Sequence, residues 1–213
     1  MKKTLLLFAA IFIGYIANAQ MGGGAQPMAA LNSGDIKSLD GVKKLNIIYD
    51  FTELGVGAFR KEQDYIDKKY KEYEEKEKGK GDKFKEAWFA ARKKTYEPVF
   101  ELMFNKYAAK DIMMSGTNYA TDNEYTLVVK TVFIEPGMNI GIAAKPAFID
   151  LECTFKDKSG AVLCVFYLKN AIGQQAMGFD YDVSSRLKES YAKSAKMLIG
   201  IIAKERKKAA KKK

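Results

Sequence analysis

The stretch TVFIEPGMNIGIAAKPAFIDLECTF, residues 131–155, decides the fold expected for this chain. Its two ends have the apolar patterns of β-strands, and Glu135-Pro136-Gly137 separates them. Proline cannot donate a hydrogen bond to a β-ladder and glycine tolerates a positive φ, so the triplet predicts the end of the first strand. We interpret the residues from there to Lys145-Pro146 as a connection between two adjacent strands, longer than a tight hairpin.

The second of these strands is predicted to form a hairpin with the segment that follows it. The apolar face of the hairpin consists of Ile149, Leu151, Cys153, Phe155, Val162, Cys164, Phe166 and Leu168. If the turn centres on Lys158-Ser159, Cys153 and Cys164 lie opposite each other, and an oxidising compartment permits a disulfide between them. A bulged turn at Gly160 would shift the register by one. A disulfide and a pair of free buried thiols therefore both remain open.

The remaining segments complete an α+β pattern. A strand is predicted at 42–51, charged helices at 60–107 with a break or kink at Pro98, a central strand at 124–134 and a closing helix from about Asp182. The apolar stripe of the closing helix is Leu187, Tyr191, Ala195, Leu198 and Ile202. This order predicts a mainly antiparallel sheet of four or five strands with helices packed on one face, a two-layer sandwich.

Three segments carry a resemblance to known proteins: KKLNIIYDF (43–51), YTLVVKTVFIEPG (125–137) and the closing helix with Tyr191 and Ala195. Together they resemble uncharacterised secreted bacterial envelope proteins. More distantly, they are similar to the small α/β domain that precedes the propeller in the Tol-system periplasmic protein. The resemblance implies a location in the cell envelope and assigns no functional residue. The long charged helices at 60–107 depart from that smaller domain.

The first twenty residues indicate an exported protein. Lys2 and Lys3 precede the apolar run 5–16, and Ala17-Asn18-Ala19 is a small-residue cleavage site before Gln20. The run is too short to span a bilayer, since a spanning helix needs about 20 apolar residues. We predict a periplasmic or secreted protein with no membrane span. Its predicted parts are a signal peptide (1–19), a flexible leader (20–35), a single α+β domain (36–203) and a basic tail (204–213).

The positive charge is concentrated at the end of the chain. Of the net charge of +10, Lys2 and Lys3 contribute +2 and the tail +6, which leaves about +2 for the predicted domain. The tail cations predicted to contact anions are Lys204, Arg206, Lys207, Lys208, Lys211, Lys212 and Lys213. Nucleic acid is not an expected partner, because the domain has neither a basic excess nor a recognition motif.

The chain contains no histidine, which removes the commonest general base and the commonest metal ligand. No catalytic, cofactor-binding or metal-binding residue is therefore predicted. The best acid pair is Asp150 and Glu152, which share one strand face about 7 Å apart, a separation that glycosidases use. Any half-exposed strand shows the same pattern. Asp180 and Asp182 are interpreted as partners of the N-terminus of the closing helix.

The leading prediction for function is an exported, non-catalytic envelope binding or assembly module. Its predicted partner is an unknown envelope protein or an anionic surface. Two alternatives remain open: a histidine-free hydrolase acting on cell-envelope or dietary glycans, and binding to a polyanion surface through the basic tail. Affinity capture from an envelope extract would separate them, because a retained protein supports the module and a retained oligosaccharide supports the hydrolase.

Overall fold

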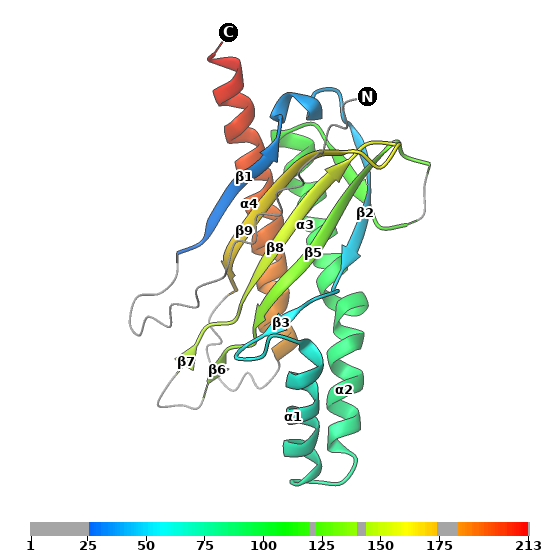
Figure 1. Ribbon diagram of the computed structural model, residues 1–213, viewed down its shortest axis with the longest axis vertical. Coiled ribbons are helices and arrows are strands. Elements are labelled where there is room, and N and C mark those ends of the chain that lie inside the picture. The colour runs from blue at the N-terminus through cyan, green and yellow to red at the C-terminus, as the bar shows by residue number, and fades with distance from the viewer. Residues whose placement is uncertain (1–25, 120–121, 140–143, 174–182, 213) are drawn as a thin grey trace, which may run out of the picture.

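The computed structural model describes residues 26–119, 122–139, 144–173 and 183–212 (Figure 1). The strands are β1 (Met28–Gly34), β2 (Lys44–Asp50), β3 (Gly55–Val56), β4 (Ser115–Thr117), β5 (Tyr125–Glu135), β6 (Met138–Asn139), β7 (Ala144–Lys145), β8 (Phe148–Lys156) and β9 (Val162–Ile172). The helices are the 3-10 helix η1 (Ile36–Leu39), α1 (Glu62–Glu74), α2 (Lys80–Ala91), the π-helix η2 (Arg92–Tyr96), α3 (Glu97–Asp111) and α4 (Val183–Ala210). The predicted signal peptide, Asp180, Asp182 and Lys213 lie outside the described residues.

The main sheet has seven strands and mixed directions. Its order is β1-β9-β8-β5-β2-β4, and β3 also pairs with β5. β2 runs parallel to β4 and β5, whereas β1, β9, β8 and β5 pair antiparallel with one another in that order. The prediction of a mainly antiparallel sheet of four or five strands is therefore wrong, although the α+β class holds. The reason is the helical crossover after β2, which returns the chain to the end of the sheet where β2 began.

Helices α3 and α4 cover one face of the main sheet (Figure 1). The predicted apolar stripe of α4 is confirmed, because Leu187, Tyr191, Ala195, Leu198 and Ile202 are all fully buried. The Tyr191 ring stacks on Tyr96 with the ring centroids 4.8 Å apart, and its hydroxyl forms a buried 2.8 Å hydrogen bond with the Thr131 hydroxyl. Tyr191 of α4 therefore contacts both β5 and η2.

The interruption at Glu135-Pro136-Gly137 ends β5, as the sequence predicts. Gly137 has φ +69°, and its N–H donates to the Glu135 carboxylate at 3.1 Å. A Cβ added at Gly137 would lie 2.6 Å from the Lys145 carbonyl oxygen, so only glycine fits this close approach. The chain then forms the small β6-β7 pair before it enters β8, which is the antiparallel neighbour of β5.

The β8-β9 hairpin has a different register from the one that would join its cysteines. Cys153 pairs with Phe166 and Cys164 pairs with Phe155, and both thiols are free and buried. The structure therefore shows the alternative of two free buried thiols, and a disulfide between them stays a prediction. The reason for this register lies in the turn, where Gly160 has φ +85° and the register shifts between Phe155 and Lys156. Burial raises the pKa of the Cys153 thiol, which disfavours the reactive thiolate.

Both ends of the predicted domain also extend further than expected. Met28–Gly34, assigned to a flexible leader, forms the edge strand β1 against β9, and Asp35 then accepts a 3.0 Å hydrogen bond from the Lys37 N–H at the start of η1. At the other end α4 continues through the predicted basic tail to Ala210. Alanine, lysine and arginine are strong helix formers, and cations near a helix C-terminus interact favourably with its dipole.

Pro98 distorts the helix that contains it without ending it. Helices α2, η2 and α3 follow one another from Lys80 to Asp111 with no gap between them. Pro98 has no N–H to donate, and the N–H of Glu97 bonds the carbonyl of Arg92 five residues back. The helix therefore widens into a π turn directly before the proline. The hairpin formed by α1 and α2 extends beyond the sheet on the far side of this turn (Figure 1).

Candidate functional site

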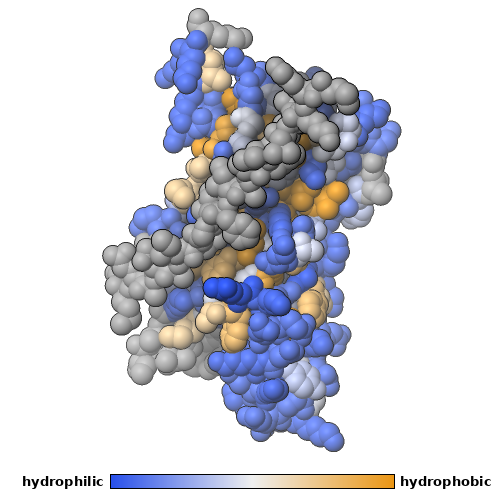
Figure 2. Space-filling view, in the orientation of Figure 1, coloured by the Kyte–Doolittle hydropathy of each residue, from blue (hydrophilic) through white to orange (hydrophobic). Residues whose placement is uncertain are grey.

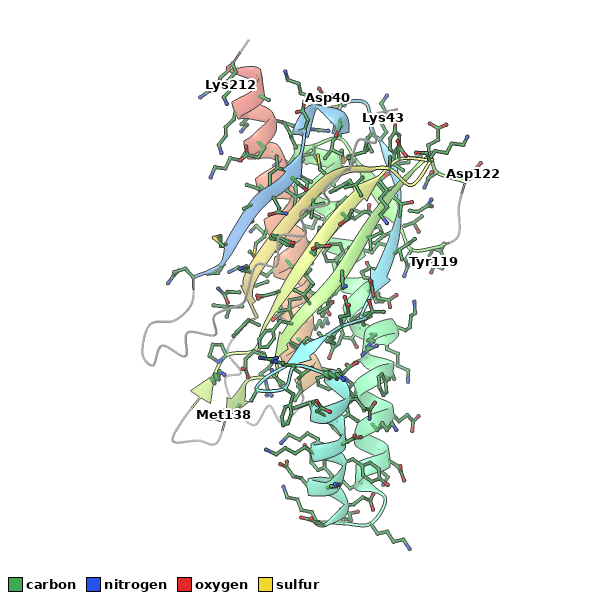
Figure 3. The ribbon with its side chains drawn as sticks, in the orientation of Figure 1. Asp40, Lys43, Tyr119, Asp122, Met138 and Lys212 are labelled. Atoms are coloured by element: carbon green, nitrogen blue, oxygen red, sulfur yellow. The ribbon has the colours of Figure 1, made fainter. Side chains whose placement is uncertain are left out.

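Lysines from separate parts of the chain gather at the end of the molecule where α4 finishes. Figure 3 labels Lys212, which follows α4, together with Asp40 and Lys43, which follow η1, at this same end. We define the basic end as the lysines Lys37, Lys43, Lys204, Lys207, Lys208, Lys211 and Lys212. All seven of these lysines are exposed. The sequence predicted a basic tail here, and the structure places Lys204, Lys207 and Lys208 on α4, which ends at Ala210.

Arg206 fastens the basic end to the body of the protein. Its Nη1 donates to the Ile112 carbonyl at 2.8 Å and its Nη2 donates to the Leu39 carbonyl at 2.7 Å. Both carbonyls lie where a helix finishes, since Leu39 ends η1 and Ile112 is the C-cap of α3. Helix ends carry carbonyls without intrahelical partners, which makes them good acceptors for a guanidinium group. Arg206 therefore acts as an anchor for α4, and the anion contact predicted for this residue stays a prediction.

Arg206 forms no ion pair with a described carboxylate. Across residues 26–119, 122–139, 144–173 and 183–212, no carboxylate lies within ion-pair distance of its guanidinium, and its buried Nε has no hydrogen-bond partner. Its two bonded partners are neutral carbonyls, which satisfy donors but cancel no net charge. The positive charge of Arg206 therefore adds to that of the surrounding lysines.

A pocket of about 370 Å³ lies beside this anchor. Its apolar lining includes Ile36, Val42, Ile112, Met113 and Ala209, and its charged lining comprises Lys37, Asp40, Lys43 and Arg206. Met113 has φ +58°, which is an uncommon backbone conformation for a residue other than glycine. Met113 is also 75% exposed. The pocket thus combines an apolar wall with three cations and one carboxylate.

The lysines of the basic end are poorly neutralised. Within the part of the chain that the structure describes, Lys208 pairs with Glu205 at 2.6 Å, and none of the other lysines of the basic end forms an ion pair. The α1–α2 hairpin is different, because Lys68 and Lys69 both approach Glu72 and Lys80 approaches Glu77. Figure 2 shows the hairpin as a hydrophilic surface, although its charges are largely matched. The unbalanced charge therefore lies at the basic end.

The base of the hairpin holds a second polar cluster. The Arg92 Nη2 donates to both oxygens of the Glu62 carboxylate at 2.5 and 2.6 Å, and the Trp88 indole donates to the same carboxylate at 2.6 Å. The Arg92 guanidinium also lies over the rings of Phe51 and Phe89, 4.3 and 4.9 Å from their centroids. Every member of this cluster has a partner within the protein, so we assign it a structural role in fixing the hairpin.

The acid pair singled out in the sequence is used by the sheet itself. The Asp150 carboxylate accepts the Asn170 N–H at 2.7 Å, where Asn170 has φ +53° and the β8-β9 register shifts. Asp150 therefore stabilises a β-bulge, and burial raises the pKa of its carboxyl group. Glu152 lies across from Lys130 on β5 and Tyr167 on β9. The two acids thus occupy positions that the strand geometry explains.

Sequence reasoning missed part of the basic end. Lys37, Lys43 and Met113 have no local signal, because each looks like an ordinary surface residue. They reach α4 only because η1, the start of β2 and the end of α3 meet there. Among the described residues, no helix is long and apolar enough to cross a membrane, and no group of three or more potential metal ligands lies together.

No family model matches the chain, and no curated protein matches it. Among solved structures, it is similar to two structures of the PelC dodecamer from Paraburkholderia phytofirmans in different space groups, at 10% and 11% identity with TM-scores of 0.39 and 0.38. The matches cover 81% of this chain and 97% and 98% of the PelC chains. Similarity at this level assigns no function.

Proposed function

We propose that this protein is an exported, non-catalytic module that attaches to an anionic lipid surface of the cell envelope through its basic end. The observation that carries the proposal is the group of lysines on and around the last turns of α4, which is largely without neutralising acids among the described residues. Export is inferred from the predicted signal peptide at residues 1–19. A basic segment gains about 1 kcal/mol per lysine or arginine near an anionic membrane.

The side chain of Met113 favours a lipid surface over an acidic polysaccharide. It is 75% exposed and lines the same pocket as Lys37 and Lys43. An apolar side chain among cations suits an interface that presents both anionic head groups and hydrocarbon, whereas a sugar polymer offers no hydrocarbon. The proposed contact is therefore a peripheral one, made by charge and one shallow apolar group.

The hydrolase alternative gains no comparable support. Its best acid pair, Asp150 and Glu152, is accounted for by a bulge and by cross-strand neighbours. An unknown envelope protein as partner stays a prediction from the sequence, and no group of described residues favours it over a lipid surface.

A vesicle-binding experiment with two matched variants tests the proposal. The first variant replaces four lysines of the basic end by glutamine: Lys207, Lys208, Lys211 and Lys212. The control replaces four exposed hairpin lysines in the same way: Lys71, Lys78, Lys83 and Lys85. Both variants lose the same formal charge, so a general effect of net charge would weaken both equally.

We expect wild-type protein to sediment with phosphatidylglycerol vesicles in low salt, and binding to fall in high salt because exposed charges are screened. The basic-end variant should bind at least tenfold more weakly, and the hairpin control should bind nearly as well as wild type. Equal losses in the two variants would contradict the proposal. Stronger retention by an acidic polysaccharide than by the vesicles would redirect it to a different surface.

A further inference from the structure

The pocket beside Arg206 has the size of a small-ligand site. Its volume is about 370 Å³, and ligand pockets in proteins occupy roughly 300–1,000 Å³. Its walls come from three places in the chain: η1 and the loop after it, the end of α3, and the last turn of α4. Because the Arg206 anchor ties these three elements together, the pocket is preformed.

The lining of the pocket is divided in chemistry. Ile36, Val42 and Ile112 are buried hydrophobic residues that form its inner wall. The exposed ammonium groups belong to Lys37 and Lys43, and Asp40 is the lone carboxylate of the lining. With Arg206 added, the lining carries three positive charges and one negative charge.

Two features point to an anion bound by this lining. Arg206 keeps its full charge because it bonds to neutral carbonyls, and its Nε is a buried donor that has no partner within the described residues. Buried polar atoms are nearly always hydrogen-bonded, so the described residues leave this Arg206 donor unsatisfied. Neither Lys37 nor Lys43 forms an ion pair with a described residue.

We infer that this pocket binds one molecule of a single-chain anionic amphiphile, with its head group among Lys37, Lys43 and Arg206 and its alkyl chain against Ile112 and Met113. This inference rests on the proposed function for the choice of a lipid-like ligand. It goes further by assigning a stoichiometric site where the proposed function requires only diffuse attraction. A fatty-acid carboxylate and a lysophospholipid phosphate share this chemistry.

Met113 offers a substitution that removes a wall of the pocket without disturbing the backbone. Its φ of +58° belongs to the left-handed region that glycine adopts readily, so Met113→Gly keeps the turn after α3 while deleting the side chain. Ala209→Trp works in the opposite way, because it fills the pocket and leaves every charge in place. The two variants perturb the pocket in opposite ways, so a variant that does not fold leaves the other to be measured.

The experiment is isothermal titration of the full chain with dodecanoate and with dodecyl phosphate, each below its micelle concentration. Dodecyl maltoside tests the need for charge, and inorganic phosphate tests the need for a chain. We expect 1:1 binding of at least one anionic probe, with at least tenfold weaker binding to Met113→Gly, to Ala209→Trp and to the double variant Lys37→Gln/Lys43→Gln. The preference between the two anionic probes distinguishes a carboxylate from a phosphate ligand.

Several results would overturn the inference: no saturable binding of either anionic probe, equally tight binding of dodecyl maltoside or of inorganic phosphate alone, or unchanged affinity in folded Met113→Gly and Ala209→Trp. The vesicle assay separates this failure from failure of the proposed function. If Ala209→Trp still sediments with anionic vesicles but wild type binds no amphiphile in solution, the surface contact stands and the pocket site falls. If the protein binds the amphiphile but does not sediment with the vesicles, the pocket site stands and the surface contact falls.

Discussion

The two ends of the molecule are both rich in charge, yet they differ in balance. Residues 62–91 of the α1–α2 hairpin contain eight basic and nine acidic residues, a net charge of −1. Residues 204–212 contain six basic residues and one acidic residue, a net charge of +5. Several hairpin charges pair along the helices, whereas at the end of α4 Lys208 with Glu205 is the ion pair found among the described residues. A high density of charge therefore describes both ends, and an excess of one sign describes the basic end alone.

The ends also differ in how they are fastened to the sheet. A carboxylate holds the base of the hairpin, because Glu62 accepts from both Arg92 and Trp88. Backbone carbonyls hold α4 through Arg206. An ion pair fixes a helix while removing charge from the surface, whereas a guanidinium bound to carbonyls fixes a helix and leaves its charge available. The following substitutions test this difference.

The largest effect is expected at the base of the hairpin. Glu62→Ala leaves Arg92 without its ion pair and the Trp88 indole N–H without its acceptor, in a pair whose side chains are 20% and 15% exposed. We expect a loss of about 3 kcal/mol in the free energy of unfolding, as for other ion pairs that are largely shielded from water. Urea denaturation measures it. The control Glu72→Ala breaks more exposed pairs and should change stability by less than about 1 kcal/mol; equal losses would remove the special role of Glu62.

A smaller loss is expected at the anchor of α4. Arg206→Met keeps much of the aliphatic length but leaves the carbonyls of Leu39 and Ile112 without their charged donor. Hydrogen bonds to a charged group contribute about 1.5–3 kcal/mol, so we expect a loss of about 2 kcal/mol. Lys207→Met, on the exposed side of the same turn, should stay within about 0.5 kcal/mol of wild type. Matching melts for the two variants would show that Arg206 is only another surface cation.

Two glycines in helices give opposite expectations at the two ends. A Cβ at Gly81 in the hairpin would lie 2.8 Å from the Tyr70 carbonyl oxygen, whereas a Cβ at Gly200 in α4 meets nothing within 4 Å. Gly81→Ala should therefore destabilise by about 1–2 kcal/mol through overpacking. Gly200→Ala should stabilise by about 0.5–1 kcal/mol through helix propensity. Thermal melts of both variants check the signs, and a stabilised Gly81→Ala would mean that the hairpin packs less closely than described.

The smallest effect concerns the sheet between the two ends. Burial raises the pKa of the Asp150 carboxyl group in the folded protein, so its ionisation at neutral pH opposes folding. Asp150→Asn keeps an acceptor for the Asn170 N–H and removes the charge. The variant should be slightly more stable than wild type at pH 7. Its advantage should shrink as the pH falls through the raised pKa and vanish below the ordinary aspartate pKa of about 3.9, where both forms are neutral. An advantage that persists at low pH would contradict this assignment.

Local patterns in the sequence predicted the elements better than their partners. The stop at Pro136-Gly137 and the apolar stripe of α4 depend on neighbouring residues, and both were predicted. The direction of β2 relative to β5 depends on a crossover of many residues, which no strand pattern contains. β1 was missed because its glycine, alanine and methionine residues form a strand only when β9 supplies the hydrogen bonds.

The sequence singled out the lysines at 204–213 as candidates, and it missed Lys37, Lys43 and the geometry that brings them together. A run such as KERKKAAKKK looks the same whether it is a solvated tail or the end of a packed helix. The difference lies in Arg206, whose acceptors Leu39 and Ile112 are remote in sequence. The cysteine register failed for a similar reason, since one glycine at positive φ in the turn changes which residues face each other.

The π turn at η2 sets the direction in which the hairpin points. Each residue of an α-helix advances the rotation about its axis by about 100°, so one residue more or fewer between Arg92 and Tyr96 changes the azimuth of α2 relative to α3 by that amount. A deletion there would carry Glu62, Trp88 and Arg92 around together and leave their mutual contacts in place. Arg92 would instead move away from Phe51, which belongs to the segment after β2. The number of residues in η2 thus determines the direction in which the α1–α2 hairpin extends from the sheet.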